Sequence, residues 1–120
     1  MAQGKTSAEV LQQFLEIPGL QGICIIGRDG FVLDFAGNLG RINNDALGAS
    51  VALVYKGVED MGRDLAVVPT QTITIEYAGA MIICQPVADA ICATVCPDSK
   101  TLGVIRHKVK SLLPNLAQFY

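Results

Sequence analysis

Two short apolar runs joined by an Asp-Gly pair constrain the fold of this chain most narrowly. The first run covers residues 22–27 and the second covers residues 31–35, with Asp29 and Gly30 between them. Asp and Gly tolerate the positive φ angles that tight hairpin turns require. The sequence therefore predicts a β-hairpin over residues 22–35.

The composition indicates a single domain with apolar surface that another subunit would cover. The chain has 120 residues, of which 51% are hydrophobic and only 17% charged. Such an apolar excess in a small chain favours a subunit interface. The net charge of −2 gives no basic excess for nucleic acid. No apolar stretch approaches the roughly 20 residues of a membrane span, and no secretory leader is visible, so we expect a cytoplasmic protein without a membrane segment.

Helical spacing of apolar residues marks the two ends of the chain. Residues 7–17 predict a short amphipathic helix, capped by Thr6 or Ser7 and stopped at Pro18. A last helix is predicted to start after residues 97–99, with Asp98 or Ser99 as its cap. Pro114 should end or bend that helix near Leu113.

Three further strands are predicted between the helices. Residues 70–77 alternate apolar and polar side chains, which indicates a strand with one buried face. Residues 81–84 form the return strand, which Pro86 should end or kink, and residues 90–96 form the fifth strand. The order is α-β-β-α-β-β-β-α, an α+β chain with an antiparallel sheet covered by helices.

A long helix is predicted from a cap at Asn43, Asn44 or Asp45 to Met61, ended by Gly62. It carries two apolar stripes, although a helix on one side of a sheet needs only one. The first stripe comprises Leu47, Val51, Val54, Val58 and Met61; the second comprises the smaller set Ala46, Ala49, Leu53 and Gly57. The second stripe fits either another helix of the same chain or a helix across a dimer, and the small residues favour the dimer.

Searches for catalytic, cofactor and metal sites give no candidate. The only histidine, His107, lies among basic residues and is interpreted as a solvated helix residue. Cys92 and Cys96 would be too far apart along a strand to share a metal ion, and all four cysteines are interpreted as buried free thiols. The P-loop-like Gly4-Lys5-Thr6 lacks the preceding strand that a phosphate site needs.

An ordered series of short motifs runs along the chain. The series comprises Pro-Gly-Leu-Gln-Gly at 18–22, Gly-Arg-Asp-Gly at 27–30, Leu-Gly-Ala at 47–49, Ile-Thr-Ile-Glu at 73–76 and Leu-Gly-Val-Ile-Arg at 102–106. This series resembles the Roadblock/LC7 family, which includes dynein light chains. It spans residues 10–109, so residues 1–120 are expected to form one such domain.

This resemblance implies a profilin-like α/β/α sandwich, with a five-stranded antiparallel sheet between the second helix and the two terminal helices. It also implies a homodimer, or a heterodimer with a paralogue, in which second helices pair and third strands meet edge to edge. The expected interface comprises Ala46, Ala49, Ser50, Leu53, Gly57, Thr72, Ile73, Thr74 and Glu76. A surface facing a further partner is expected at Lys56, Glu59 and Arg63.

The resemblance further implies a non-catalytic role toward a small Ras-like GTPase, as a regulator or scaffold. Family members that stimulate GTP hydrolysis supply no nucleophile, because they reshape the GTPase's own site. Three alternatives stay open. They are a motor-associated adaptor, a small-molecule sensor with a cavity lined by Cys24, Cys84 or Cys92, and an enzyme.

Overall fold

The computed structural model describes residues 6–39, 43–100 and 102–120. Its elements are α1 (Ser7–Leu15), β1 (Gly22–Ile26), β2 (Val32–Gly37), α2 (Asn44–Asp64), β3 (Ile73–Tyr77), β4 (Ala80–Val87), β5 (Ala90–Cys96) and α3 (Leu102–Ala117). The strands form one five-stranded antiparallel sheet in the order β2-β1-β5-β4-β3. The predicted element order and antiparallel sheet are confirmed.

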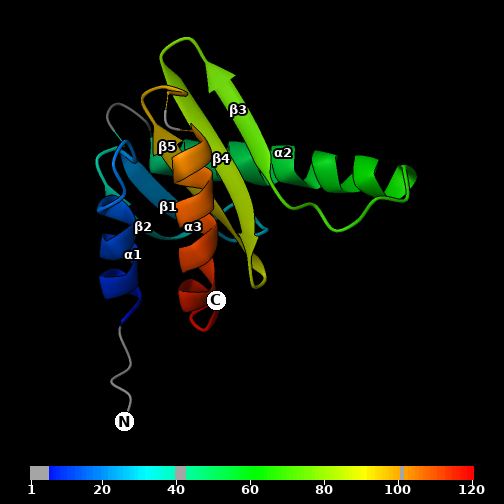
Figure 1. Cartoon of the computed structure of the whole chain (residues 1–120). Coiled ribbons are helices and arrows are strands. Elements are labelled where there is room, and N and C mark those ends of the chain that lie inside the picture. Colours follow the sequence, from blue (N-terminus) through cyan, green and yellow to red (C-terminus); the bar gives the residue numbers. More distant parts are fainter. Residues whose placement is uncertain (1–5, 40–42, 101) are drawn as a thin grey trace.

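The sheet separates two hydrophobic cores (Figure 1). Helices α1 and α3 lie side by side on one face, and α2 crosses the other face with its C-terminal part extending past the sheet. The central strands β1 and β5 are buried along their whole length because helices cover both faces. None of the helices in the described ranges has the length and apolar character needed to cross a bilayer.

The β1–β2 hairpin forms as the Asp-Gly pair predicts. The Gly27 N–H donates to the Phe31 carbonyl at 2.8 Å, and the Asp29 side chain accepts from the Phe31 N–H at 3.1 Å. Gly30 adopts a φ of +93°, which a residue with a Cβ rarely reaches. The register shifts between Ile25 and Ile26, so β2 carries an extra residue near the turn.

Side-chain caps fix the starts of α1 and α2. Thr6 and Glu9 form a reciprocal capping box at α1, and the Asn43 side chain accepts from the Asp45 and Ala46 N–H groups at α2. Gly4 and Lys5 of the P-loop-like tripeptide lie outside the described residues. Helix α1 ends at Leu15, two residues before the predicted end.

Gly62 does not end α2, which is a correction to the prediction. The helix continues to Asp64, and a Cβ at Gly62 would lie 2.7 Å from the Val67 carbonyl oxygen. The glycine therefore allows the following loop to approach the helix closely instead of stopping it.

Two prolines lie inside elements that they were predicted to end or bend, and neither of them ends its element. Strand β4 continues through Pro86 to Val87; β3 pairs only as far as Cys84, so Pro86 has a neighbour on one side alone. Helix α3 continues past Pro114 to Ala117, although Pro removes a helical hydrogen bond. The fully buried Leu116 holds this last turn against the core.

Helix α2 lies against the hairpin turn because glycines meet there. A Cβ at Gly48 would lie 2.6 Å from the Gly30 carbonyl oxygen and 3.0 Å from a methyl group of Val32. A Cβ at Gly30 would lie 3.4 Å from Cα of Ala49. The distance between helix and sheet is thus set by the absence of side chains at this crossing.

The Gly48→Ala substitution should therefore lower the free energy of unfolding by about 1–3 kcal/mol, because the new methyl group meets backbone that cannot rotate away. Gly103→Ala is the matched control. It adds the same methyl group to a helix where nothing lies within 4 Å, so stability should change by less than about 1 kcal/mol. Urea unfolding at one protein concentration measures both, and equal stabilities would contradict the close contact.

Candidate protein-interaction surface

The inward side of α2 is built on Leu47, Val51 and Tyr55. All three are buried, and they pack with Cys24 and Ile26 of β1 in the core on this side of the sheet. The predicted inward stripe is partly wrong, because Val54 and Met61 are 42% and 55% exposed. Tyr55 takes their place, since it follows Leu47 and Val51 at intervals of four residues.

The outward face of α2 is the apolar set opposite this buried side. It consists of Ala46, Ala49, Ser50, Leu53 and Gly57, all of which are exposed. Leu53 is 74% exposed, and a Cβ at Gly57 would have no neighbour within 4 Å. The second stripe of small residues thus has no partner among the described residues of this chain.

Exposed apolar side chains continue beyond this face at the C-terminal end of α2. Met61, Leu65, Val67 and Val68 are each more than half exposed, around an open hollow of about 520 Å³. Sequence reasoning missed this extension. The adjacent pair Val67 and Val68, placed just before Pro69, was the available signal.

The expected β3 residues lie along the outer edge of the sheet. Strand β3 pairs only with β4, and Figure 1 shows no element beyond it. Thr74 and Glu76 are exposed, whereas Thr72 and Ile73 are half-buried. An unpaired edge leaves backbone N–H and C=O groups open to another strand.

The three residues expected to face a further partner are engaged in ion pairs. Glu59 binds Arg28 at 2.5 Å, Lys56 binds Asp60 at 3.2 Å, and Arg63 also binds Asp60. Lys56 and Arg63 remain largely exposed, so a partner can reach them. The Glu59 carboxylate is directed to the hairpin and is less exposed.

Arg28 joins three elements of the fold. Its guanidinium bonds Glu59 of α2, donates to the Asp89 carbonyl of the β4–β5 turn at 3.2 Å, and lies 5.2 Å from the centre of the Tyr55 ring. The hydrogen bond to Glu59 raises the pKa of Arg28. This contact fixes the rotation of α2 about its axis, and sequence reasoning did not find it.

The four cysteines are buried free thiols, as predicted. Burial raises the pKa of Cys24, with a smaller contribution from Asp34, and also that of Cys84; both reach about 11. Burial likewise raises the pKa values of Cys92 and Cys96. All four are therefore uncharged and poorly nucleophilic at neutral pH.

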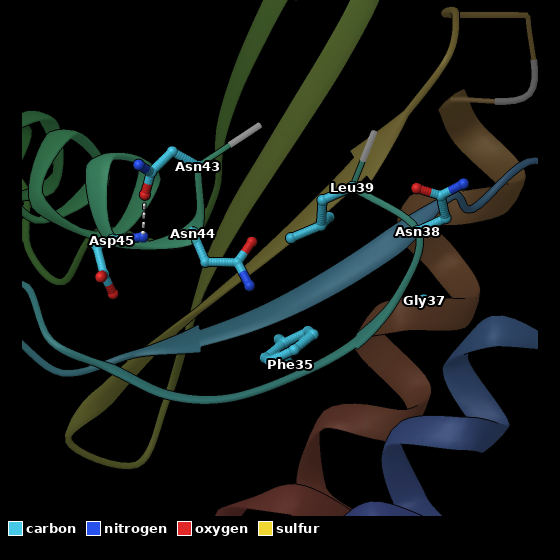
Figure 2. A pocket seen from close by; sticks show the side chains of 7 residues that line it. All are labelled: Phe35, Gly37, Asn38, Leu39, Asn43, Asn44 and Asp45. Carbon is cyan, nitrogen blue, oxygen red and sulfur yellow. Dashed lines mark hydrogen bonds between the residues drawn. The ribbon is translucent and has the colours of Figure 1, made fainter. Parts of the chain in front are cut away.

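No candidate metal site forms in the part of the chain that the structure describes. No three His, Cys, Asp or Glu side chains gather there to hold a metal ion. His107 is exposed, as predicted. An open hollow of about 480 Å³ lies between β2 and the start of α2. Figure 2 shows the side chains that line it, among them Phe35, Leu39 and Asn44. The hydrogen bond drawn there joins the Asp45 N–H to the Asn43 side chain as the helix cap.

The sequence was compared with models of known protein families. The model described as the Roadblock/LC7 domain matches residues 6–96. The chain belongs to the Roadblock/LC7 family. Comparison with curated protein sequences gave no match.

Solved structures agree with this Roadblock/LC7 fold. The gliding protein MglB of Thermus thermophilus superposes with a TM-score of 0.84 at 22% identity, over 93% of this chain and 86% of that one. Myxococcus xanthus MglB gives 0.87 at 13% identity, over 98% and 97%. A Roadblock/LC7 domain from Streptomyces avermitilis gives 0.78 at 13% identity, over 93% and 92%.

A double-mutant cycle of Arg28→Met and Glu59→Gln should give a coupling of about 0.5–1 kcal/mol in urea unfolding, because this pair connects two elements. The matched cycle uses Lys56→Met and Asp60→Asn within α2. It should give less, since those side chains are more exposed and belong to one helix. A coupling at Arg28 no larger than that at Lys56 would contradict the role of Arg28 in holding α2.

Proposed function

We propose that this Roadblock/LC7 domain, residues 1–120, is a dimeric non-catalytic cytoplasmic module that regulates or scaffolds a small Ras-like GTPase. The observation that carries the proposal is the outward face of α2, where an apolar stripe of small residues meets solvent around Leu53. Family membership supports a small GTPase as the partner, and the outward face of α2 supports assembly as a dimer.

The dimer contact proposed for α2 follows from the size of its residues. Ala46, Ala49, Ser50 and Gly57 let a second helix approach closely, and Leu53 gives that contact an apolar centre. Burying one leucine side chain contributes about 1.5–3 kcal/mol. Several exposed apolar side chains on one helix therefore supply a driving force for association.

The open edge of β3 supports the same mode of assembly. A two-fold related β3 would pair the free backbone groups at Ile73 and Thr74, so that this edge accepts one further copy and no more. One matched structure shows MglB in a tetrameric arrangement, at 22% identity and a TM-score of 0.85. Self-association through this fold therefore has a precedent in a similar protein.

A role in binding without catalysis agrees with the state of the thiols and of the charged groups on α2. The thiols are buried with raised pKa values, and Lys56, Glu59 and Arg63 are held in surface ion pairs. A domain that reshapes the catalytic site of a GTPase needs a shaped surface and no nucleophile of its own. We place that surface next to the paired α2 helices, at Lys56 and Arg63.

The Leu53→Glu substitution should convert a dimer into a monomer, because it places two carboxylates in the apolar centre of a two-fold contact. Light scattering at tens of micromolar measures the mass. Val104→Glu is the matched control: Val104 is a 52% exposed apolar residue on α3, and its variant should remain dimeric. A monomeric wild type would contradict the dimer.

The same variants test the partner. Immobilised wild type and Val104→Glu should recover a small GTPase from a lysate of the source organism, and Leu53→Glu should not, because the binding surface needs both copies. Mass spectrometry identifies the GTPase, and GTP hydrolysis with purified components then separates activation from tethering. Equal recovery by Leu53→Glu would show that binding does not require the dimer, and recovery of no GTPase would contradict the proposed partner.

A further inference from the structure

A groove lies between α3 and the start of β3, on the side of the sheet opposite α2. It consists of two adjoining hollows of about 310 and 260 Å³, and both are lined by Gln71, Thr72, Gln85 and Lys110. We call it the α3–β3 groove. It is separate from the outward face of α2, because Gln85 belongs to the row of β4 residues whose side chains face α3.

Gln85 is the unusual residue of this groove. It is only 4% exposed, and its neighbours in the same row, Met81, Ile83 and Val87, are buried apolar residues. Its Nε2 donates to Thr72 Oγ1 at 3.5 Å, while its Oε1 has no hydrogen-bond partner among the described residues. With the amide reversed, Thr72 would bond the oxygen and the NH₂ group would be left unpaired.

An unpaired buried amide group costs about 1–3 kcal/mol, whereas an apolar residue at this position would cost nothing of that kind. The Gln85 side chain lines both hollows of the groove, but its Oε1 is itself shielded from solvent, so a ligand bonds this atom only when the lining residues part. The open hydrogen-bonding position of Gln85 therefore points to a ligand.

Basic side chains form the α3 side of the groove. Arg106 and His107 line one hollow together with Lys110, and all three are exposed. None of them takes part in the ion pairs found between described residues, which involve only α2 and the hairpin. The groove thus presents positive charge that the described part of the chain does not neutralise.

Apolar side chains form the other end. Pro69, Pro86 and Leu113 line the hollow farther from Arg106. A ligand that fills the whole groove must combine an apolar part with a negatively charged part. In the amide orientation described it must also carry a hydrogen-bond donor for Gln85 Oε1, and the backbone N–H groups of a peptide supply such donors.

We propose that the α3–β3 groove binds an acidic, extended segment of a partner protein. A carboxylate of the segment contacts Arg106 and Lys110, a backbone N–H donates to Gln85 Oε1, and an apolar side chain packs between Pro86 and Leu113. Charge complementarity selects the partner, because charge-assisted bonds to Arg and Lys are the strong contacts available here.

Fluorescence anisotropy tests the proposal with a short fluorescein-labelled peptide of alternating glutamate and leucine. Wild type should bind it saturably and more weakly as salt rises. The double variant Arg106→Gln/Lys110→Gln should bind about tenfold or more weakly. Lys108→Gln is the control for charge on α3 outside the groove. It removes one positive charge, where the double variant removes two, and Lys108 lines a different hollow, so affinity should stay within about twofold.

Gln85→Leu separates binding from folding. Leucine keeps the volume and removes the unpaired amide, so the variant should melt at the same or a higher temperature and still bind the peptide several-fold more weakly. A stable Gln85→Leu variant with unchanged affinity would overturn the role of Gln85. The Leu53→Glu variant should bind as wild type does, so failure of the dimer and failure of this groove are told apart.

Three other results would overturn the proposal. The first is no saturable binding by wild type. The second is equal weakening by Lys108→Gln, which would mean attraction to α3 as a whole. The third is equal binding of a peptide with glutamine in place of glutamate, or full competition by inorganic phosphate at equal concentration, which would mean that the acidic peptide is not the ligand.

Discussion

The close crossing of α2 over the β1–β2 turn is the constraint on which the rest of the structure depends. Gly48 lets α2 approach the Gly30 carbonyl, where a methyl group on the helix would clash with the turn. Arg28 then fixes the helix about its axis through Glu59 and Tyr55. Once Tyr55 faces the sheet, Leu53 must face away, because residues two apart on a helix lie on opposite sides. The interaction surface is thus a consequence of how the helix is seated.

Local patterns were sufficient to predict most of the fold. The Asp29-Gly30 turn, the cap at Thr6 and the alternation in β3 depend on neighbouring residues, so the sequence shows them directly. Whether Gly62, Pro86 and Pro114 end their elements could not be decided from the local sequence, because it depends on distant residues. Gly62 meets the backbone of Val67, Pro86 lies beyond the last pair of β3, and Pro114 sits in a helix held by the buried Leu116. In each case tertiary packing outweighs a local preference.

The sequence predicted that α2 forms more reliably than it predicted which of its residues are buried. A helix that is apolar over much of its circumference has no unique inward side by periodicity, so Val54 and Met61 were placed inward instead of Tyr55. The set around Leu53 was nevertheless correctly separated from the buried side, because its small residues mark it. Gln85 gave no signal at all, since one polar residue in an apolar strand looks like an ordinary interruption. Only the fold shows that it lies between a bare sheet edge and a basic helix.

The positions of the four thiols make local opening of the fold detectable, because two thiols lie on each side of the sheet. Cys24 and Cys84 belong to the core beneath α2, whereas Cys92 and Cys96 belong to the core beneath α1 and α3. Local opening of α2 exposes the first pair to solvent, and local opening of a terminal helix exposes the second pair. The order in which the cysteines become accessible therefore distinguishes partial detachment of the helix that carries the outward face from loosening of the opposite layer. Thiol accessibility thereby reports on the two faces of the sheet separately, and it does so in the wild-type protein.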